Sequence, residues 1–234
     1  MKGALALVAL LSFAPAQEEV TLKWKPKVGE PVNLQMKLSM AITGAGDVDV
    51  NFIVHSKVTK MDSETVTTES KISDFKLMFN GQEMDMGGQG GPDMSQTSTM
   101  VQKLNGEIVS MSGAEMQGGE RTSRMNAFHW PDKPVKIGDS WTKEWQAEKE
   151  KQLPHSKAKW TLAAHEMKNG VDTYRVDYVF AEMDDPNGIS ASGSVWLATT
   201  DGTIQYGTYQ FNNVSFQEGM PPTSGTGQII RLKN

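Results

Sequence analysis

The sequence predicts a mainly β fold: an antiparallel curved sheet or half-barrel built from two similar halves, with a short helical linker. Apolar and polar side chains alternate over long stretches, glycine-containing turns separate these stretches, and two short motifs occur once in each half. Alternation with a period of two places the apolar side chains on one face of a strand, as in an antiparallel sheet with one wet face.

The clearest alternation follows an early glycine turn. Its apolar members share one parity: Val32, Leu34, Met36, Leu38, Met40 and Ile42. A second run continues from Val48 to Lys60. In a third run the apolar parity changes between Ile72 and Phe75, which predicts a β-bulge that bends the strand.

The connections carry their own signals. Asn105-Gly106 between two extended runs predicts a hairpin with a type I′ turn. Residues 80–96 are rich in Gly and Met and predict a mobile loop or flap. Residues 112–128 predict a linker with a helical turn at 120–128, and we expect the flap and the linker to cover part of an apolar concave face.

The repeated motifs indicate an internal duplication. Val28-Gly29-Glu30 matches Ile137-Gly138-Asp139, and Asn105-Gly106 matches Asp201-Gly202. We therefore expect a first half at 17–111, a linker at 112–130 and a second half at 131–234 within one continuous domain. The alternative is that unrelated β-hairpins reuse the same turn residues.

Met1 to Ala16 has the features of a secretory signal peptide. Lys2 is followed by a short apolar run and by Ala14-Pro15-Ala16, which fits a cleavage site. The apolar run is shorter than the roughly 20 residues that span a bilayer, and no later segment is long enough. We expect an exported, periplasmic or secreted protein with no transmembrane segment; the alternative for residues 1–16 is a buried terminal element.

Composition excludes several classes of function. The net charge of −5 does not suit a protein that neutralises nucleic-acid phosphates. The absence of cysteine excludes disulfides, thiol catalysis and cysteine–zinc sites. Gly188 to Gly193 is not a G-x-S-x-G motif, and the four histidines lack metal-ligand spacing. The sequence therefore predicts no catalytic residue, no bound cofactor and no enzyme activity.

The Met-rich stretch offers one metal hypothesis. Met84, Met86 and Met94 are thioether ligands of the kind that bind Cu(I). The alternatives are adaptable apolar contact with a ligand or partner, and a flexible loop without a site. The six tryptophans could line a pocket, but in β-proteins they more often close the ends of the core.

The run Pro134-Val135-Lys136-Ile137-Gly138-Asp139-Ser140-Trp141 resembles a P-V-K-x-G-D-x-W element found midway in a group of exported bacterial β-rich proteins of unassigned function. The layout is also similar to the half-barrel lipoprotein carriers of the LolA and LppX types. That resemblance implies a curved sheet that holds acyl chains under a lid, and hence lipid or lipoprotein binding. No functional residue of the carriers can be aligned with this chain.

The favoured function is therefore a non-catalytic binder of an apolar or amphipathic ligand in the cell envelope, with a lipid or an envelope protein as partner. The alternative is a protein-interaction or structural component of the envelope. An enzyme is the third class, and no residue pattern in the sequence favours it.

Overall fold

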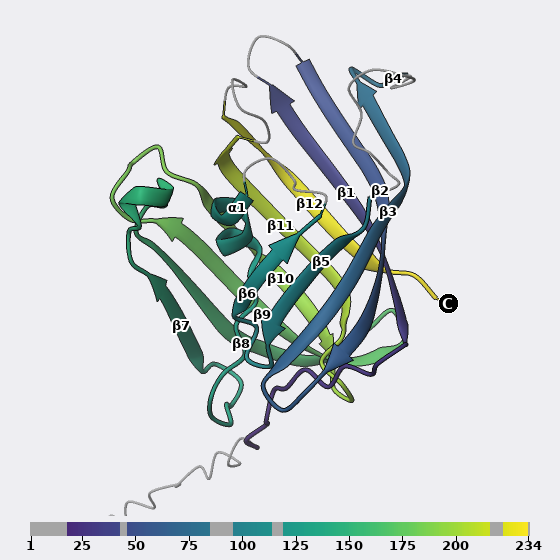
Figure 1. Cartoon of the computed structure of the whole chain (residues 1–234), viewed down its shortest axis with the longest axis vertical. Helices are drawn as coiled ribbons and strands as arrows, with labels where there is room; N and C mark the ends of the chain where they lie inside the picture. The colour runs from purple at the N-terminus through teal and green to yellow at the C-terminus, as the bar shows by residue number, and fades with distance from the viewer. Residues whose placement is uncertain (1–17, 43–45, 85–95, 114–118, 216–221, 234) are drawn as a thin grey trace, which may run out of the picture.

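The structure, a computed structural model, describes residues 18–42, 46–84, 96–113, 119–215 and 222–233. These residues form one antiparallel sheet of 12 strands, which curves without closing, and one α-helix, α1 (Gly119–Asn126) (Figure 1). The predicted mainly β class, the curved antiparallel sheet and the helical linker are confirmed. The predicted signal peptide lies outside the described residues.

The strands are long in the middle of the sheet and short at its first edge. Their bounds are β1 (Pro31–Ile42), β2 (Gly46–Met61), β3 (Thr65–Phe79), β4 (Gln82–Met84), β5 (Ser98–Lys103), β6 (Ile108–Ser112), β7 (Ser140–Trp145), β8 (Ser156–Lys168), β9 (Val171–Glu182), β10 (Ser190–Ala198), β11 (Ile204–Val214) and β12 (Thr223–Arg231). A short 3₁₀ helix, η1 (Lys149–Lys151), precedes β8.

The strand order is β6-β5-β3-β2-β1-β12-β11-β10-β9-β8-β7, and β4 pairs with β3 off this path. Each half is a meander, because successive strands along the chain are neighbours in the sheet. The halves join where β1 pairs with β12, so the first and last of these strands lie in the middle of the sheet.

The predicted alternation and the predicted bulge are both confirmed. In β1, Leu38 is buried while Lys37 and Ser39 are exposed. In β3 an extra residue at Asp74–Phe75 opposes Phe52 of β2, and Asp74 has a φ of 52°. The bulge restores apolar side chains to the same face of the sheet after the parity change in the sequence.

The type I′ turn is predicted at the wrong place. At the β5–β6 turn only Gly106 has a positive φ, of 91°, whereas a type I′ turn needs positive φ at both central residues. Asn80 and Gly81 meet that requirement, with φ of 48° and 78°, and they connect β3 to β4. The segment that we expected to be a flap therefore begins as a β-hairpin, because Asn80-Gly81 favours a tight turn between β3 and β4. Residues 85–95 lie outside the described residues.

The two copies of each motif adopt similar geometry. The N–H of Gly29 donates to the carbonyl of Val58 (2.9 Å), and the N–H of Gly138 donates to the carbonyl of Leu162 (2.7 Å). Each glycine thus ties the lead-in of one strand to the neighbouring strand, and each has a positive φ. The side chains of Asn105 and Asp201 also make equivalent bonds, each accepting the N–H two residues further on. The duplication itself stays a prediction.

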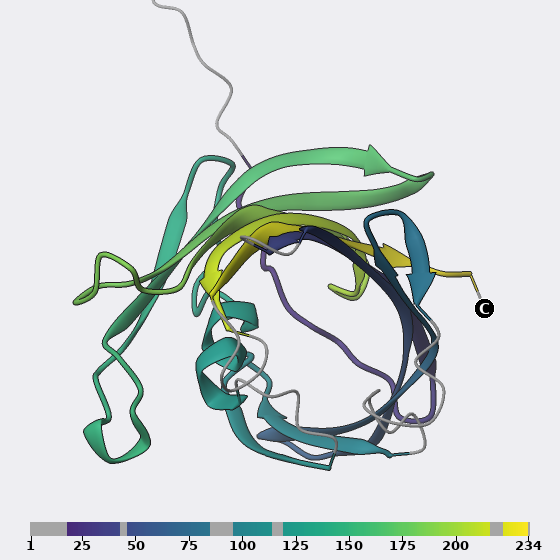
Figure 2. The same ribbon diagram turned by 90° about the horizontal axis from the view of Figure 1, so that it is seen from above.

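Residues 18–30, here called the strap, cross one end of the curved sheet (Figure 2). Val20 forms two backbone hydrogen bonds with Val135, both of 2.9 Å, and Lys25 donates its N–H to Asp201 at the β10–β11 turn. Leu22 is 3% exposed and belongs to the hydrophobic core. The strap therefore connects Val135, at the start of the second half, to Val58 of β2 in the first half.

Candidate functional site

One face of the sheet carries the core, and we call it the inward face. Residues that are paired directly across strands lie on the same face, so a single row can be followed across the sheet. That row is Trp141, Trp160, Tyr178, Gly193, Tyr209, Gly227, Leu38, Val50 and Leu77. Leu22 of the strap and Met125 of α1 pack in the same core, and both segments lie inside the curve (Figure 2). The inward face is therefore the concave one.

The inward face of β8–β11, here called the sealed wall, is mostly covered, and a few of its large side chains, such as Tyr178, Tyr209 and Ile204, keep part of their surface in water. Trp160, Leu162 and Phe180 are each at most 1% exposed. An aromatic group from the linker and β7 covers Trp160, with ring centroids of Phe128 and Trp141 at 6.1 and 6.4 Å. Large apolar side chains that are wholly removed from water make this wall the main source of hydrophobic stabilisation.

The inward face of β1–β3, here called the open wall, is only partly covered. Five of the apolar side chains described on it are buried (Leu38, Val48, Phe52, Val58 and Val66), but most of the others keep part of their surface in water. These half-buried residues are Met36, Met40, Val50, Val54, Ile72 and Phe75. The two walls have the same alternation, and they differ in what lies over them.

Between the walls, aromatic rings lie across glycines of β12. A Cβ atom added at Gly225 would lie 2.9 Å from Cζ of Phe211, and one added at Gly227 would overlap the ring of Tyr209. A side chain at either position would push the ring away from the sheet. Glycine in these strands therefore lets two rings lie flat where the halves meet.

Tyr178 and Tyr209 flank Gly193 on the inward face. Burial raises the pKa of both phenols, to about 12 for Tyr209, so both stay protonated at neutral pH. Neither hydroxyl makes a hydrogen bond to another residue in the described part of the chain. They are suited to donate a hydrogen bond to a bound molecule and unsuited to act as a base.

The strap end of the open wall is polar. Ser56, Ser70 and Ser98 form a row across β2, β3 and β5, with Ser56 Oγ 2.8 Å from Ser70 Oγ. Thr68, in the adjacent row, is 8% exposed, and its Oγ1 has no partner among the described residues. Arg231 of β12 pairs with Leu34 and lies on the same face. The open wall therefore carries hydroxyl groups and a guanidinium near the strap, alongside the buried Val58 and Val66, and apolar side chains at the other end.

Helix α1 lies between the two edges of the curve. Ser123 Oγ lies 3.5 Å from Met111 Sδ of β6, and Arg121 makes two 2.5 Å hydrogen bonds to Glu182 at the end of β9. The Glu182 side chain is 1% exposed, so this ion pair holds a buried carboxylate. The helix thus bridges the first edge of the sheet to the second half.

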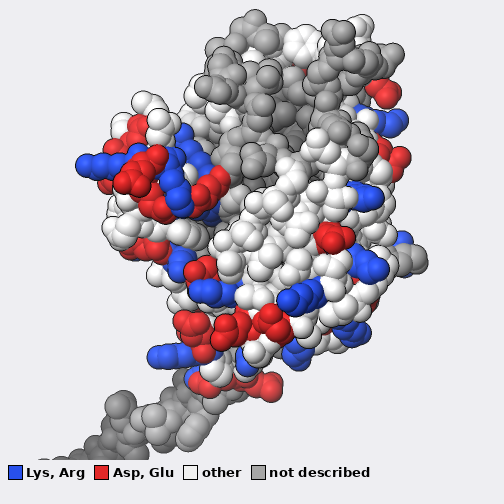
Figure 3. Space-filling view, in the orientation of Figure 1, with Lys and Arg blue, Asp and Glu red and all other residues white. Residues whose placement is uncertain are grey.

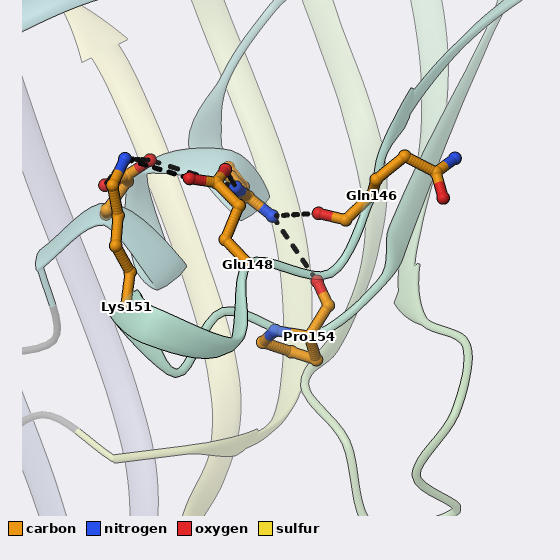
Figure 4. Close-up of polar contacts among 6 residues, drawn as sticks. Gln146, Glu148, Lys151 and Pro154 are labelled. Carbon is orange, nitrogen blue, oxygen red and sulfur yellow. Dashed lines mark hydrogen bonds and ion pairs between the residues drawn. The ribbon is translucent and has the colours of Figure 1, made fainter.

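Arg124 fixes the other side of α1 (Figure 4). Its guanidinium forms an ion pair with Glu148 and donates to the carbonyl of Pro154 at 3.3 Å. Lys151 adds an ion pair to Glu148 at 3.0 Å. Charges of both signs gather over α1 and η1 (Figure 3), so this surface offers no field of one sign for a charged partner.

One small cavity lies between the strap and the second half. It has a volume of about 20 Å³, room for about one water molecule, and it is lined by Leu22, Trp130 and Leu197 among others. The strap therefore packs closely on the second half, and this cavity is too small for an organic ligand.

The structure leaves the copper hypothesis untested and locates several of the tryptophans. Met84 lies on β4 and is 47% exposed, while Met86 and Met94 lie outside the described residues, so the copper hypothesis stays a prediction. No cluster of three or more His, Asp or Glu suited to a metal occurs in the described ranges. Trp130 and Trp160 are core residues, whereas Trp196 lies outside the core and donates to Glu166.

Sequence reasoning did not single out Arg231 or the two tyrosines. Residues 227–232 read as a strand, and Arg231 shares the parity of Ile229 and Gly227. That parity could have placed the arginine on the apolar face, which is an unusual position for a charge.

Comparisons with known proteins add little. No protein-family model matches the sequence, and no curated protein matches it. One solved structure that it resembles is from Bacteroides fragilis and is described as a presumed exported protein with a YmcC-like fold. The identity is 10%, the TM-score is 0.34, and the match covers 92% of this chain and 100% of the other. A likeness of this degree carries no argument about function. No described helix is long and apolar enough to cross a membrane.

Proposed function

We propose that this protein is an exported, non-catalytic binder of an apolar or amphipathic ligand, which it takes up on the open wall. One observation carries the proposal: inside the curved sheet, most inward apolar side chains of β1–β3 keep part of their surface in water, whereas most of those of β8–β11 are buried. Concave sites lined mainly by apolar side chains, with few polar groups, are typical of small-molecule binding.

The composition of the open wall suits a flexible ligand. Met36 and Met40 lie among its half-buried side chains, and Met100 extends the face onto β5. Methionine is unbranched and polarisable, so it can repack against ligands of different shape. A carrier of alkyl chains gains from such adaptability.

The nature of the polar groups supports binding rather than catalysis. Tyr178 and Tyr209 stay protonated because burial raises the pKa of each phenol. Both belong to the sealed wall, but the ring of Tyr209 lies over Gly227 of β12, next to the open wall. A hydroxyl group there can orient a ligand by donating a hydrogen bond, and it cannot accept a proton from the ligand at neutral pH.

Export is supported by the sequence of residues 1–16 alone. The basic start, the short apolar run and the Ala14-Pro15-Ala16 site are those of a signal peptide. We propose the cell envelope or the exterior as the location, and a lipid or an envelope protein as the partner.

The test uses the chain from residue 17 onward, purified with and without delipidation. Native mass spectrometry should show a bound amphiphile before delipidation, and the delipidated protein should take up a fluorescent fatty acid. Val54→Trp should fill the open wall and block uptake. Ile53→Trp, one position away on the opposite face of β2, is the matched control and should leave uptake unchanged. Absence of both copurified lipid and uptake contradicts the proposal.

A protein partner is the second candidate, favoured by the edge strand β6. Val109 and Met111 of this strand are 55% and 53% exposed. An unpaired edge with exposed apolar side chains can accept a strand from another protein. Val109→Lys should abolish capture of an envelope protein while leaving fatty-acid uptake intact; loss of uptake alone would argue against this role.

A further inference from the structure

We infer that the ligand of the open wall is an anionic amphiphile, whose negative headgroup binds Arg231 and whose alkyl chain lies along β1–β3. This inference rests on the proposed function and adds the charge and the orientation of the ligand. It depends on three features of the inward face: an unpaired guanidinium, hydroxyl groups on nearby strands, and an apolar strip that leads away from this end.

Arg231 is a charged side chain in an apolar setting. It lies directly opposite Leu34, in a row that continues through Val54 and Ile72. Its Nη1 is buried, and no hydrogen-bond partner for that atom exists in the described part of the chain. A guanidinium nitrogen removed from water without an acceptor is unfavourable, and a bound anion would supply the missing acceptor.

Hydroxyl groups lie on the same face as the arginine, two and three strands away on β2 and β3. Ser56 and Ser70 occupy the row next to that of Arg231, and Thr68 lies one row further toward the strap. The Oγ1 of Thr68 is a second buried polar atom without a partner among the described residues. Carboxylate and phosphate oxygens accept hydrogen bonds from a guanidinium, so Arg231 is matched to an anionic head, and the hydroxyl groups keep the surrounding surface polar.

The remaining rows of the wall are apolar. Along β2 the inward side chains after Ser56 are Val54, Phe52, Val50 and Val48, a strip of roughly 20 Å at the rise of an antiparallel strand. Gly29 of the strap bonds to Val58 and closes the polar end, so the strip leads away from the strap. The chain of a ligand whose head sits at Arg231 would therefore extend toward the opposite end of the sheet.

The test compares ligands that share one alkyl chain and differ only in the head: laurate, lauryl phosphate and lauryl alcohol. Each displaces the neutral dye Nile red from delipidated protein (residues 17–234), and the displacement gives its affinity. We expect the wild-type protein to bind at least one of the two anions about tenfold more tightly than the alcohol. The ranking of laurate and lauryl phosphate distinguishes a carboxylate head from a phosphate head.

Arg231→Met should reduce this preference to about twofold or less and leave the affinity for lauryl alcohol unchanged. Arg175→Met is the matched control, because Arg175 lies on the opposite face of β9 and pairs with Glu166 and Asp177. If Arg231→Met does not fold, Arg231→Gln and Arg231→Lys replace it, and only the lysine variant should keep a preference.

The outcomes separate the two proposals. Equal binding of all three ligands by the wild type, or an unchanged preference in Arg231→Met, overturns the inference about charge while the proposed function stands. Failure of every ligand to displace Nile red, or of Nile red to bind, overturns the proposed function as well.

Discussion

The sealed wall and the open wall have the same alternating pattern and different surroundings. On β8–β11 the strap, the aromatic linker and α1 remove most of the inward side chains from water, whereas on β1–β3 most of the corresponding side chains are half-buried. The comparison shows that alternation identifies the face of a sheet that turns inward. What covers that face depends on segments elsewhere in the chain, and the cover determines whether the face stabilises the fold or binds a ligand.

The largest expected effect comes from truncating the sealed wall. Trp160→Ala should lower the free energy of unfolding by about 3–5 kcal/mol, because it leaves a cavity where a side chain was 1% exposed. Val54→Ala on the open wall should cost about 1 kcal/mol or less, since Val54 already contacts water. Urea unfolding of both variants measures the difference, and equal costs would remove the distinction between the walls.

The next effect separates glycines that contact the covering segments from those that do not. Gly106→Ala and Gly202→Ala should each cost more than about 2 kcal/mol, because the new methyl group would meet the carbonyl oxygen of Phe128 or of Lys23 in addition to backbone strain. Gly29→Ala and Gly138→Ala should cost about 1–2 kcal/mol, from positive φ alone, because nothing lies within 4 Å of the added atom. Similar losses of stability for Gly106→Ala and Gly202→Ala, and for Gly29→Ala and Gly138→Ala, would also fit the predicted duplication.

A third variant tests how α1 is held over the curve. Arg121→Met removes the charged partner of the Glu182 carboxylate, which is 1% exposed and keeps, among the described residues, only the hydrogen bond from the N–H of Ile189, and should cost about 2 kcal/mol. Lys151→Met breaks ion pairs that are largely exposed and should cost about 0.5 kcal/mol or less. Thermal unfolding at low salt compares the two. Equal losses would show that the buried carboxylate does not need its arginine.

The smallest effect is a dependence on pH near β7–β9. The hydrogen bond that His155 donates to Glu144, with a further contribution from Asp184, raises the pKa of His155 above 6.5, and the same bond lowers the pKa of Glu144 below 4.5. The histidine contribution is complete below pH 6.5 and is lost as the pH rises through its folded-state pKa. The glutamate contribution is complete above pH 4.5 and is lost as the pH falls through its folded-state pKa.

The pair should therefore stabilise the fold fully between pH 4.5 and 6.5. His155→Gln should flatten the fall in melting temperature between pH 6 and pH 8, measured by calorimetry. His165→Gln, which removes a different exposed histidine, is the control. An unchanged slope in His155→Gln would refute the assignment.

Local patterns in the sequence predicted much of the fold. The parity of Leu38 and its neighbours placed β1, and the parity change before Phe75 located the bulge, because both depend on side chains close in the chain. The turn at Asn105-Gly106 was assigned the wrong type, since dipeptide identity does not fix φ when a distant residue such as Trp130 bonds to the turn.

The candidate site was less predictable. Whether Val54 or Leu162 is covered depends on the strap and the linker, which come from other parts of the chain. The position of Arg231 on the inward face, opposite Leu34, depends on the pairing of β12 with β1, which lies nearly the full length of the sequence away. Contacts of this range leave no local signature in the residues that make them.

The central place of β12 has a consequence for synthesis. Until this strand emerges from the ribosome, β1 and β11 each present a row of unsatisfied backbone N–H and C=O groups, and the glycines that receive the rings of Tyr209 and Phe211 are missing. The nascent chain would then expose two unpaired strand edges, and such edges can pair with strands of other chains and cause aggregation. Holding the newly made protein unfolded until its last strand is available would avoid that hazard.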